Sequence, residues 1–153
     1  MPMPEATGPD EIFIRDLRLE DYEAVTRLWT EAGLPFRPHG RDSVAKMALE
    51  LTRGTAVFLV AEDRGALVGV ALGTHDGRKG WINRLAVASD YRRRGIGARL
   101  VSEVEVRLAE MGIDIIAALI ETHNEDSLTF FRSIGYLHDP EIEYVSKRAS
   151  PES

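Results

Sequence analysis

The chain contains no cysteine, and this absence excludes several chemistries at once. Disulfides, thiolate zinc sites and cysteine nucleophiles all require that residue. Long apolar runs are also missing, since no stretch approaches the ~18 residues of a membrane-spanning helix. The first five residues lack a basic region followed by an apolar stretch, so they do not resemble a signal peptide. These absences favour a cytoplasmic protein that does not enter a membrane.

The composition that remains is ordinary for a folded domain. The chain has 153 residues, of which 44% are hydrophobic and 29% are charged. This length corresponds to one domain with a substantial core. We expect residues 1–10, which include three prolines, to form a flexible leader and residues 148–153 to form a flexible tail. Residues 11–147 would form the domain between them.

The charge of the chain is negative overall but unevenly distributed. The net charge of −6 predicts that the molecule as a whole does not bind nucleic acid or anionic membranes. Residues 78–99 contain seven cations and one acid, Asp90, so this segment carries +6 and the rest carries −12. This basic segment indicates a local anion site, and a solvated basic loop is the alternative. The four histidines show no ligand spacing, so we expect no metal site.

Apolar periodicity predicts a mixed α/β domain with the order β-α-α-β-β-β-α-β-α-β-β. Helices are expected on the faces of one mostly antiparallel sheet, with a parallel crossover from the strand at 81–87 through a long helix to a strand at 115–120. The other strands are predicted near Ile12–Ile14, at 57–61 and 67–72, and at two closing positions, 136–137 and 142–145. The other helices are predicted at 22–32, 44–51 and 127–134.

The most informative motif is Arg92-Arg93-Arg94-Gly95-Ile96-Gly97, which lies between a predicted strand and a predicted helix. A helix start exposes unpaired N–H groups that bind anions, and glycine lets a phosphate approach the backbone closely. The motif lacks the Gly-Lys-Ser/Thr ending of a Walker A loop. It also comes too late in the chain, after a hairpin, for a dinucleotide-binding βαβ unit.

This loop, after the strand 85–87, resembles the acetyl-CoA signature of the GCN5-related N-acetyltransferases (GNAT family). A second element agrees: Asn124 opens a predicted helix that ends in Gly135 and Tyr136, similar to the family's later motif. The resemblance covers the chain from about Ile12 to Val145. It implies transfer of an acetyl group from acetyl-CoA to a primary amine, of a small molecule or a protein, by direct attack in a ternary complex.

The resemblance also implies which residues bind the cofactor. The backbone from Arg93 to Ala98 would hold the pyrophosphate, and the strand 85–87 would pair with the pantetheine amides. A backbone N–H near Leu85 or Val87 would polarise the thioester carbonyl. The full set of cofactor-binding residues is then Leu85, Ala86, Val87, Arg92, Arg93, Arg94, Gly95, Ile96, Gly97, Ala98, Asn124 and Phe131.

The two usual catalytic positions of the family are changed in this chain. The position of the usual tyrosine acid is Phe131, and the position of the usual glutamate base is Leu119. Three substitutes are candidates for the catalytic groups: Glu121, His123 and His75. A non-catalytic acyl-CoA-binding or regulatory domain is therefore the alternative function, and a nucleic-acid binder that uses the arginines is a third.

The acceptor site is expected between the first two helices, their connecting loop and the late hairpin. That region contains an aromatic and basic set, Trp29, Phe36, Arg37, His39 and Arg41. Such a lining would suit an amine that carries a carboxylate, although Trp29 as a core residue and the others as solvated loop residues is the alternative. The sequence leaves open whether a homodimer forms through an exposed sheet edge.

Overall fold

The computed structural model describes residues 11–153, so the predicted leader lies outside the described residues. The sheet consists of β1 (Ile12–Asp16), β2 (Ala56–Asp63), β3 (Ala66–His75), β4 (Gly80–Val87) and β5 (Ile116–Ala118). The α-helices are α1 (Tyr22–Glu31), α2 (Val44–Leu51), α3 (Ile96–Glu110) and α4 (Glu125–Ser133). Short 3-10 turns, η2 (Leu19–Asp21) and η3 (Ser89–Tyr91), precede α1 and follow β4. Among the residues described, no helix is long and apolar enough to span a membrane.

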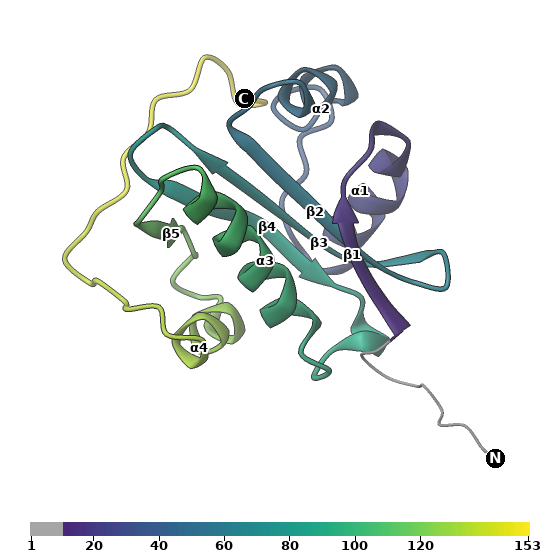
Figure 1. Ribbon diagram of the computed structural model, residues 1–153. Helices are drawn as coiled ribbons and strands as arrows, with labels where there is room; N and C mark the ends of the chain where they lie inside the picture. Colours follow the sequence, from purple (N-terminus) through teal and green to yellow (C-terminus); the bar gives the residue numbers. More distant parts are fainter. Residues whose placement is uncertain (1–10) are drawn as a thin grey trace.

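The five strands form one sheet in the order β1-β2-β3-β4-β5. Every neighbouring pair is antiparallel except β4 and β5, which are parallel and joined through α3. Figure 1 shows α3 and α4 on one side of the sheet and α1 and α2 on the other. The sheet is therefore covered on both faces, as the apolar sequence of its central strands predicts.

Strand β2 shows how the sequence divides the core between the two faces. Its alternate residues Val57, Leu59 and Ala61 pack in the cluster beneath α3. Phe58 and Val60, which point the opposite way, pack with α1 and α2. All five are buried because successive side chains of a strand point to opposite faces.

Two glycines of β3 let α3 lie close to the sheet. A β-carbon at Gly73 would lie 2.6 Å from a methyl carbon of Val104, and one at Gly69 would lie 3.0 Å from a methyl carbon of Leu100. Both helix residues are fully buried. This close packing fixes the position of α3, and with it the loop that precedes the helix.

The predicted mixed α/β fold is confirmed, with the predicted order of elements through α4 and the predicted parallel pair. The two closing strands at 136–137 and 142–145 do not form in the described structure. A strand needs a partner edge, but the chain turns at Asp139, whose side chain accepts from the N–H of Glu141 at 3.0 Å, and then runs exposed past β5. Strand β5 is thus the edge of the sheet, and the homodimer stays a prediction.

Candidate active site

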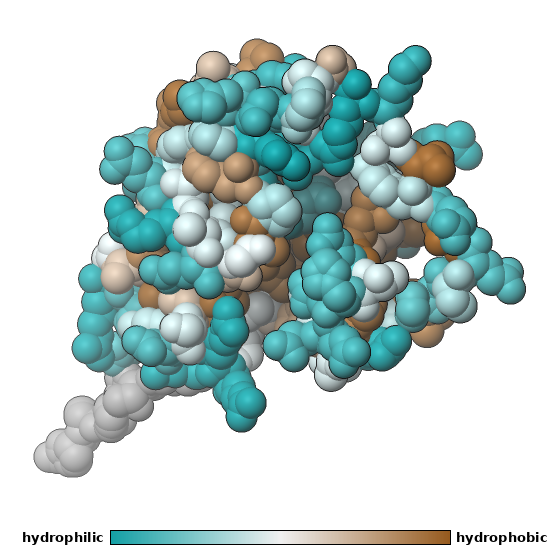
Figure 2. Space-filling model, turned by 180° about the vertical axis from the view of Figure 1, so that it is seen from behind, coloured by the Kyte–Doolittle hydropathy of each residue, from teal (hydrophilic) through white to brown (hydrophobic). Residues whose placement is uncertain are grey.

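The site begins where two parallel strands separate. Strands β4 and β5 are paired only from Gly80 and Ile116 to Ile82 and Ala118. Beyond Ile82, β4 continues to Val87 with β3 on one side and, among the described residues, no strand on the other. In the view from the α1 and α2 side, Figure 2 shows a deep hollow with apolar residues at its floor. The strands thus form a slot with a free backbone edge.

A β-bulge marks the start of this free edge. Between the pairs Val70–Ala86 and Leu72–Asn83, two residues of β4 oppose one residue of β3. The first of the two, Arg84, has a left-handed backbone with φ of 57°. A bulge of this kind bends its strand, which gives a local reason for the separation of β4 from β5.

The loop Arg92–Gly97 lies directly beyond the free edge. Arg93 and Gly95 both have left-handed backbones, with φ of 65° and 79°. Gly95 is the N-cap of α3 and supplies no side chain to the first turn, whereas Ser43 and Asn124 cap α2 and α4 through their side-chain oxygens. The first N–H groups of α3 therefore point outward without a side-chain acceptor, as an anion site requires.

The arginines of the loop are only loosely bound to the protein. Arg94 stacks on the ring of Tyr91 at 4.7 Å, and Tyr91 donates to Asp63 at 2.6 Å. Arg92 makes one long contact, 3.5 Å, from its Nε to the carbonyl oxygen of Val87. All three arginines, Arg92 to Arg94, are exposed. Their charges are thus available to a phosphate beside the helix start.

The side chains of the predicted cofactor strand, residues 85–87, point to both faces of the sheet. Leu85 and Val87 are half-buried against the cluster beneath α3, whereas Ala86 is buried against α1 and α2. The structure also adds Phe130, whose ring would lie 3.4 Å from a β-carbon at Gly97. The sequence placed Phe131 in the site, and helical periodicity alone does not decide which of two adjacent phenylalanines faces the loop.

The second family motif, residues 124–136, makes contacts that mainly stabilise the fold. Asn124 accepts from the N–H of Ser127 at 3.2 Å and so caps α4. Phe131 is buried and packs edge-to-face against Phe130 and Tyr136. The hydroxyl of Tyr136 donates to Glu105 at 2.6 Å, and burial raises the pKa of this tyrosine. The hydroxyl of Tyr136 is thus engaged with α3.

Two of the three predicted catalytic residues come together. His123 Nε2 lies 3.2 Å from Glu121 Oε1, and both side chains are exposed. They follow Ala118, the last residue of β5, by three and five residues and lie in the turn before α4. His75 lies elsewhere: its Nδ1 accepts from the N–H of Gly77, and it pairs with Gly80 at the closed end of the slot. The bulge residue Arg84 follows Gly80 by four residues along β4, a span of roughly 13 Å.

A second polar group, which the sequence did not identify, lies on the α1 and α2 side of the bulge. Arg84 donates to the carboxylate of Asp42 and to the carbonyl oxygen of Pro35, and its guanidinium stacks on Trp29 at 4.4 Å. The side chains of Arg84 and Asp42 are 11% and 8% exposed. Trp29 is fully buried, as a core residue. No sequence signal pairs residues 42 positions apart, so only the structure shows this anchor.

Comparison with known proteins identifies the family. The profile of the acetyltransferase (GNAT) family matches residues 14–136. The acetyltransferase SG1711 of Sodalis glossinidius (strain morsitans) is 32% identical over 135 residues, which cover 88% of this chain and 94% of the relative. The chain therefore belongs to the GNAT acetyltransferase family.

Solved structures share the fold at lower identity. The enzyme AAC(6')-Iy, bound to a bisubstrate analogue made of CoA and acetylneamine, has a TM-score of 0.75 at 17% identity, over 90% of this chain and 99% of that one. The PaiA N-acetyltransferase of Thermoplasma acidophilum, solved with coenzyme A, has a TM-score of 0.72 at 23% identity, over 84% and 91%. The family confirms the predicted acetyl-CoA-dependent N-acetyltransferase with acetyl-CoA as acyl donor.

The residues present fit acetyl-CoA on structural grounds. The free edge of β4 suits an extended amide chain, which pairs with such an edge as an added strand. The uncapped start of α3 suits a pyrophosphate, and Gly97 leaves room for it beside Phe130. Among residues 11–153 there is no group of three or more His, Cys, Asp or Glu side chains that could hold a metal ion.

Proposed function

We propose that the chain transfers the acetyl group of acetyl-CoA directly to a primary amine while both substrates are bound. One observation carries this proposal: the free edge of β4 is followed, after η3 and the arginine loop, by the uncapped N-terminus of α3. The pantetheine arm pairs with residues 85–87, and the pyrophosphate binds the N–H groups from Arg93 to Ala98. The thioester then lies near the bulge, between the anchor at Arg84 and the pair Glu121–His123.

The chemical step follows from these positions. The amine nitrogen attacks the thioester carbon, the C–N bond forms, and the C–S bond breaks to release the thiolate of coenzyme A. A backbone N–H near Leu85 or Val87 stabilises the developing oxyanion. Because a typical amine is protonated at pH 7, a base must first remove a proton. Imidazole groups exchange protons near neutral pH, so His123 accepts this proton and Glu121 stabilises the resulting cation.

The lack of a tyrosine hydroxyl at Phe131 does not prevent the step. A thiolate is a far better leaving group than an alkoxide, because the pKa of a thiol is low. Protonation of the leaving sulfur by water or by the released amine proton then suffices. Because Phe131 stands at the position of the usual tyrosine, an acyl-CoA-binding domain without catalysis is the second candidate function.

The test combines binding and turnover. We expect acetyl-CoA to bind in the micromolar range by calorimetry, and we expect Gly97→Trp to abolish binding because the indole fills the space beside Phe130. Gly54→Trp is the matched control, since Gly54 has open space and no positive φ. Melting curves confirm that both variants fold.

Thiol release measured with and without amines then separates the two functions. Amine-dependent release supports catalysis, and binding without release from a broad amine panel supports the acyl-CoA-binding domain. Absence of binding by the folded wild-type protein would sink the assignment of the slot to acetyl-CoA.

A further inference from the structure

The loop that connects α1 to α2 is attached directly to the reaction end of the slot. Arg84, in the bulge of β4, holds this loop through the carbonyl oxygen of Pro35 and the carboxylate of Asp42. Tyr22 of α1 donates to the carbonyl oxygen of Asp42 at 2.6 Å and secures the loop from the other side. The residues of this loop therefore lie where an acceptor must approach the thioester.

Three arginines share the single acid of this loop. The Asp42 carboxylate is buried, and one of its oxygens accepts from the backbone N–H of Arg37 at 2.8 Å and from Arg84. Arg41 Nε lies 3.8 Å from the same oxygen, at the limit of an ion pair. The Asp42 carboxylate therefore pairs with the guanidinium groups of Arg84 and Arg41, whereas Arg37 contacts it through its backbone N–H. Arg84 uses this charge, so the other two leave a local excess of positive charge.

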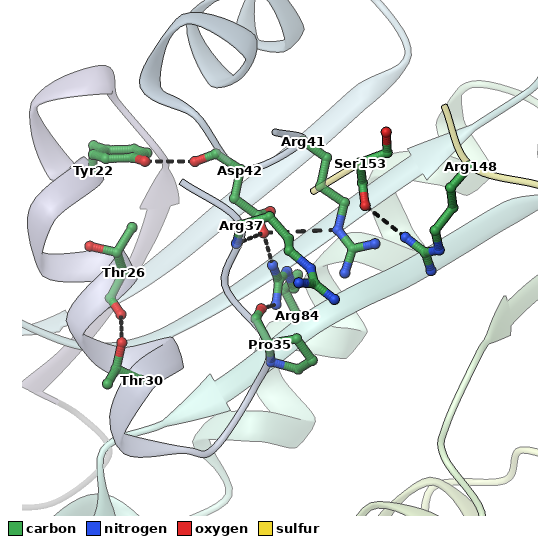
Figure 3. Close-up of polar contacts among 10 residues, drawn as sticks. All are labelled: Tyr22, Thr26, Thr30, Pro35, Arg37, Arg41, Asp42, Arg84, Arg148 and Ser153. Carbon is green, nitrogen blue, oxygen red and sulfur yellow. Dashed lines mark hydrogen bonds and ion pairs between the residues drawn. The ribbon is translucent and has the colours of Figure 1, made fainter. Parts of the chain in front are cut away.

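The side chain of Arg37 shows that this excess is unsatisfied. Its Nε is buried from solvent, yet it has no hydrogen-bond partner among the described residues. A buried donor without a partner costs free energy, so such a group indicates a missing acceptor. Figure 3 shows the guanidinium groups of Arg37 and Arg41 beside that of Arg84, with Arg148 extending from the tail toward the same region.

The C-terminal tail, residues 148–153, packs beside these arginines. A β-carbon at Gly40 would collide with the carbonyl oxygen of Glu152, so residues 152–153 lie against the loop. Arg148 donates to the carbonyl oxygen of Ser153 at 2.7 Å, which holds this part of the tail in a turn. The carboxyl group of Glu50 interacts with that of Asp42, and burial is the largest cause that raises the pKa of Glu50.

We propose that the acceptor is an amine that carries a carboxylate, and that Arg37 and Arg41 bind this carboxylate. This inference rests on the proposed function and names its substrate class. Arginine binds carboxylates by paired N–H donors, and an acceptor oxygen supplies the partner that Arg37 Nε lacks. The arginines also repel an acceptor with several positive charges. AAC(6')-Iy, by contrast, is an aminoglycoside N-acetyltransferase, and its bisubstrate analogue contains acetylneamine.

The test uses matched pairs of amines that differ only in the anionic group. Thiol release is measured with amino acids and with their amides, with β-alanine and with propylamine, and with spermidine. Phosphoethanolamine and ethanolamine form a further pair that distinguishes phosphate from carboxylate. We expect kcat/KM to be at least tenfold higher for the carboxylate member of each pair, and spermidine to be a poor substrate.

Variants then test whether Arg37 and Arg41 cause the preference for a carboxylate. Arg37→Ala and Arg41→Ala should each raise KM for the acidic amine roughly ten- to hundredfold, with little effect on the KM of acetyl-CoA or on the neutral amine. Arg27→Ala, an exposed arginine on α1, is the matched control and should leave the preference unchanged. Arg41 is exposed, so its variant keeps the test valid if Arg37→Ala fails to fold.

Binding provides a readout that does not depend on turnover. Calorimetry of the acids against the protein saturated with coenzyme A should show binding that both variants weaken. Equal rates for charged and neutral partners, a preference for spermidine, or acid binding that is unchanged in both variants would overturn the proposed acceptor class. A preference for phosphoethanolamine would overturn the carboxylate in favour of a phosphate. Acid binding without any acetyl transfer would contradict the proposed function while supporting the anion site.

Discussion

At the scale of single residues, we propose that the pair Glu121–His123 replaces the tyrosine and the glutamate that the family resemblance implies at Phe131 and Leu119. Leu119 and Phe131 supply no proton acceptor or donor, whereas Glu121 lies two residues beyond Leu119 and contacts His123 at 3.2 Å. Sequence spacing suggested both residues separately. Their contact requires the turn after β5, which brings alternate residues of the chain together. The catalytic roles of this pair and of His75 stay predictions.

The roles of the pair can be tested by substitution. His123→Ala should lower kcat about a hundredfold, because a positioned base contributes on that order, and Glu121→Gln should lower it about tenfold. The KM for acetyl-CoA should not change, since neither residue belongs to the loop Arg92–Gly97 that we propose binds the pyrophosphate. Initial rates of thiol release at saturating amine provide the measurement. His138→Ala, another exposed histidine, near Arg132, is the control and should retain full activity. Full activity of His123→Ala would exclude this base.

At the scale of elements, the bulge of β4 and the loop between α1 and α2 form one unit. The bulge residue Arg84 joins Trp29 on α1 to Asp42 before α2. Both charged side chains of this pair are nearly buried, so each depends on the other. The bulge that bends β4 away from β5 thus also positions the loop that we propose faces the acceptor.

Removal of one partner tests this unit. Arg84→Met should lower the free energy of unfolding by about 3 kcal/mol, because it leaves the Asp42 carboxylate buried without a partner. The double variant Arg84→Met with Asp42→Asn should recover part of the loss, because the charge is removed. Urea unfolding followed by tryptophan fluorescence measures both. Arg27→Met on exposed α1 is the control, with an expected change within ±0.5 kcal/mol. A loss in Arg84→Met no larger than the control's would show that the pair does not hold the loop.

At the scale of the whole molecule, an ion-pair network joins the first strand to its neighbours. Arg15 of β1 donates to both oxygens of Asp21 at 2.8 and 3.0 Å and to Glu62 of β2 at 2.7 Å. Asp21 also accepts from the backbone N–H of Arg18 at 2.8 Å. The Arg15 hydrogen bonds are the largest cause that lowers the pKa of Asp21, although burial opposes them.

This lowered pKa makes the stability of the fold depend on pH. A carboxyl group whose pKa is lower in the folded state stabilises the protein above its unfolded pKa of about 3.9, and the contribution disappears as pH falls through the folded value. Asp21→Asn should therefore reduce the free energy of unfolding by about 2 kcal/mol at pH 7. The difference from wild type should shrink below about pH 4.

Urea unfolding at pH 7, 5 and 3 measures this dependence, and Asp114→Asn, at an exposed position, is the control. A difference between wild type and Asp21→Asn that stays constant down to pH 3 would contradict this explanation.

Much of the fold could be predicted because local signals agree with tertiary packing. The alternation in β2 and the helical spacing of Val25, Leu28 and Trp29 each specify one buried face, and those faces pack as expected. The closing strands failed because Leu137 and Val145 carry strand-forming apolar side chains but meet no partner edge; they are 96% and 87% exposed. Apolar sequence is necessary for such a strand, and a partner edge, which is a tertiary property, decides whether it forms.

The sequence by itself determined the family of this protein and located the loop that we propose binds the phosphates. Gly95 and Gly97 lie where a helix must start, and the chemistry of that start depends on local backbone geometry. Only the tertiary structure decided how the acceptor side is anchored, because Arg84 comes from β4 whereas Asp42 and Arg37 come from the loop between α1 and α2. The effect of their charges depends on burial and on contact with the Asp42 carboxylate. A local sequence pattern does not specify which distant residues will contact the same carboxylate.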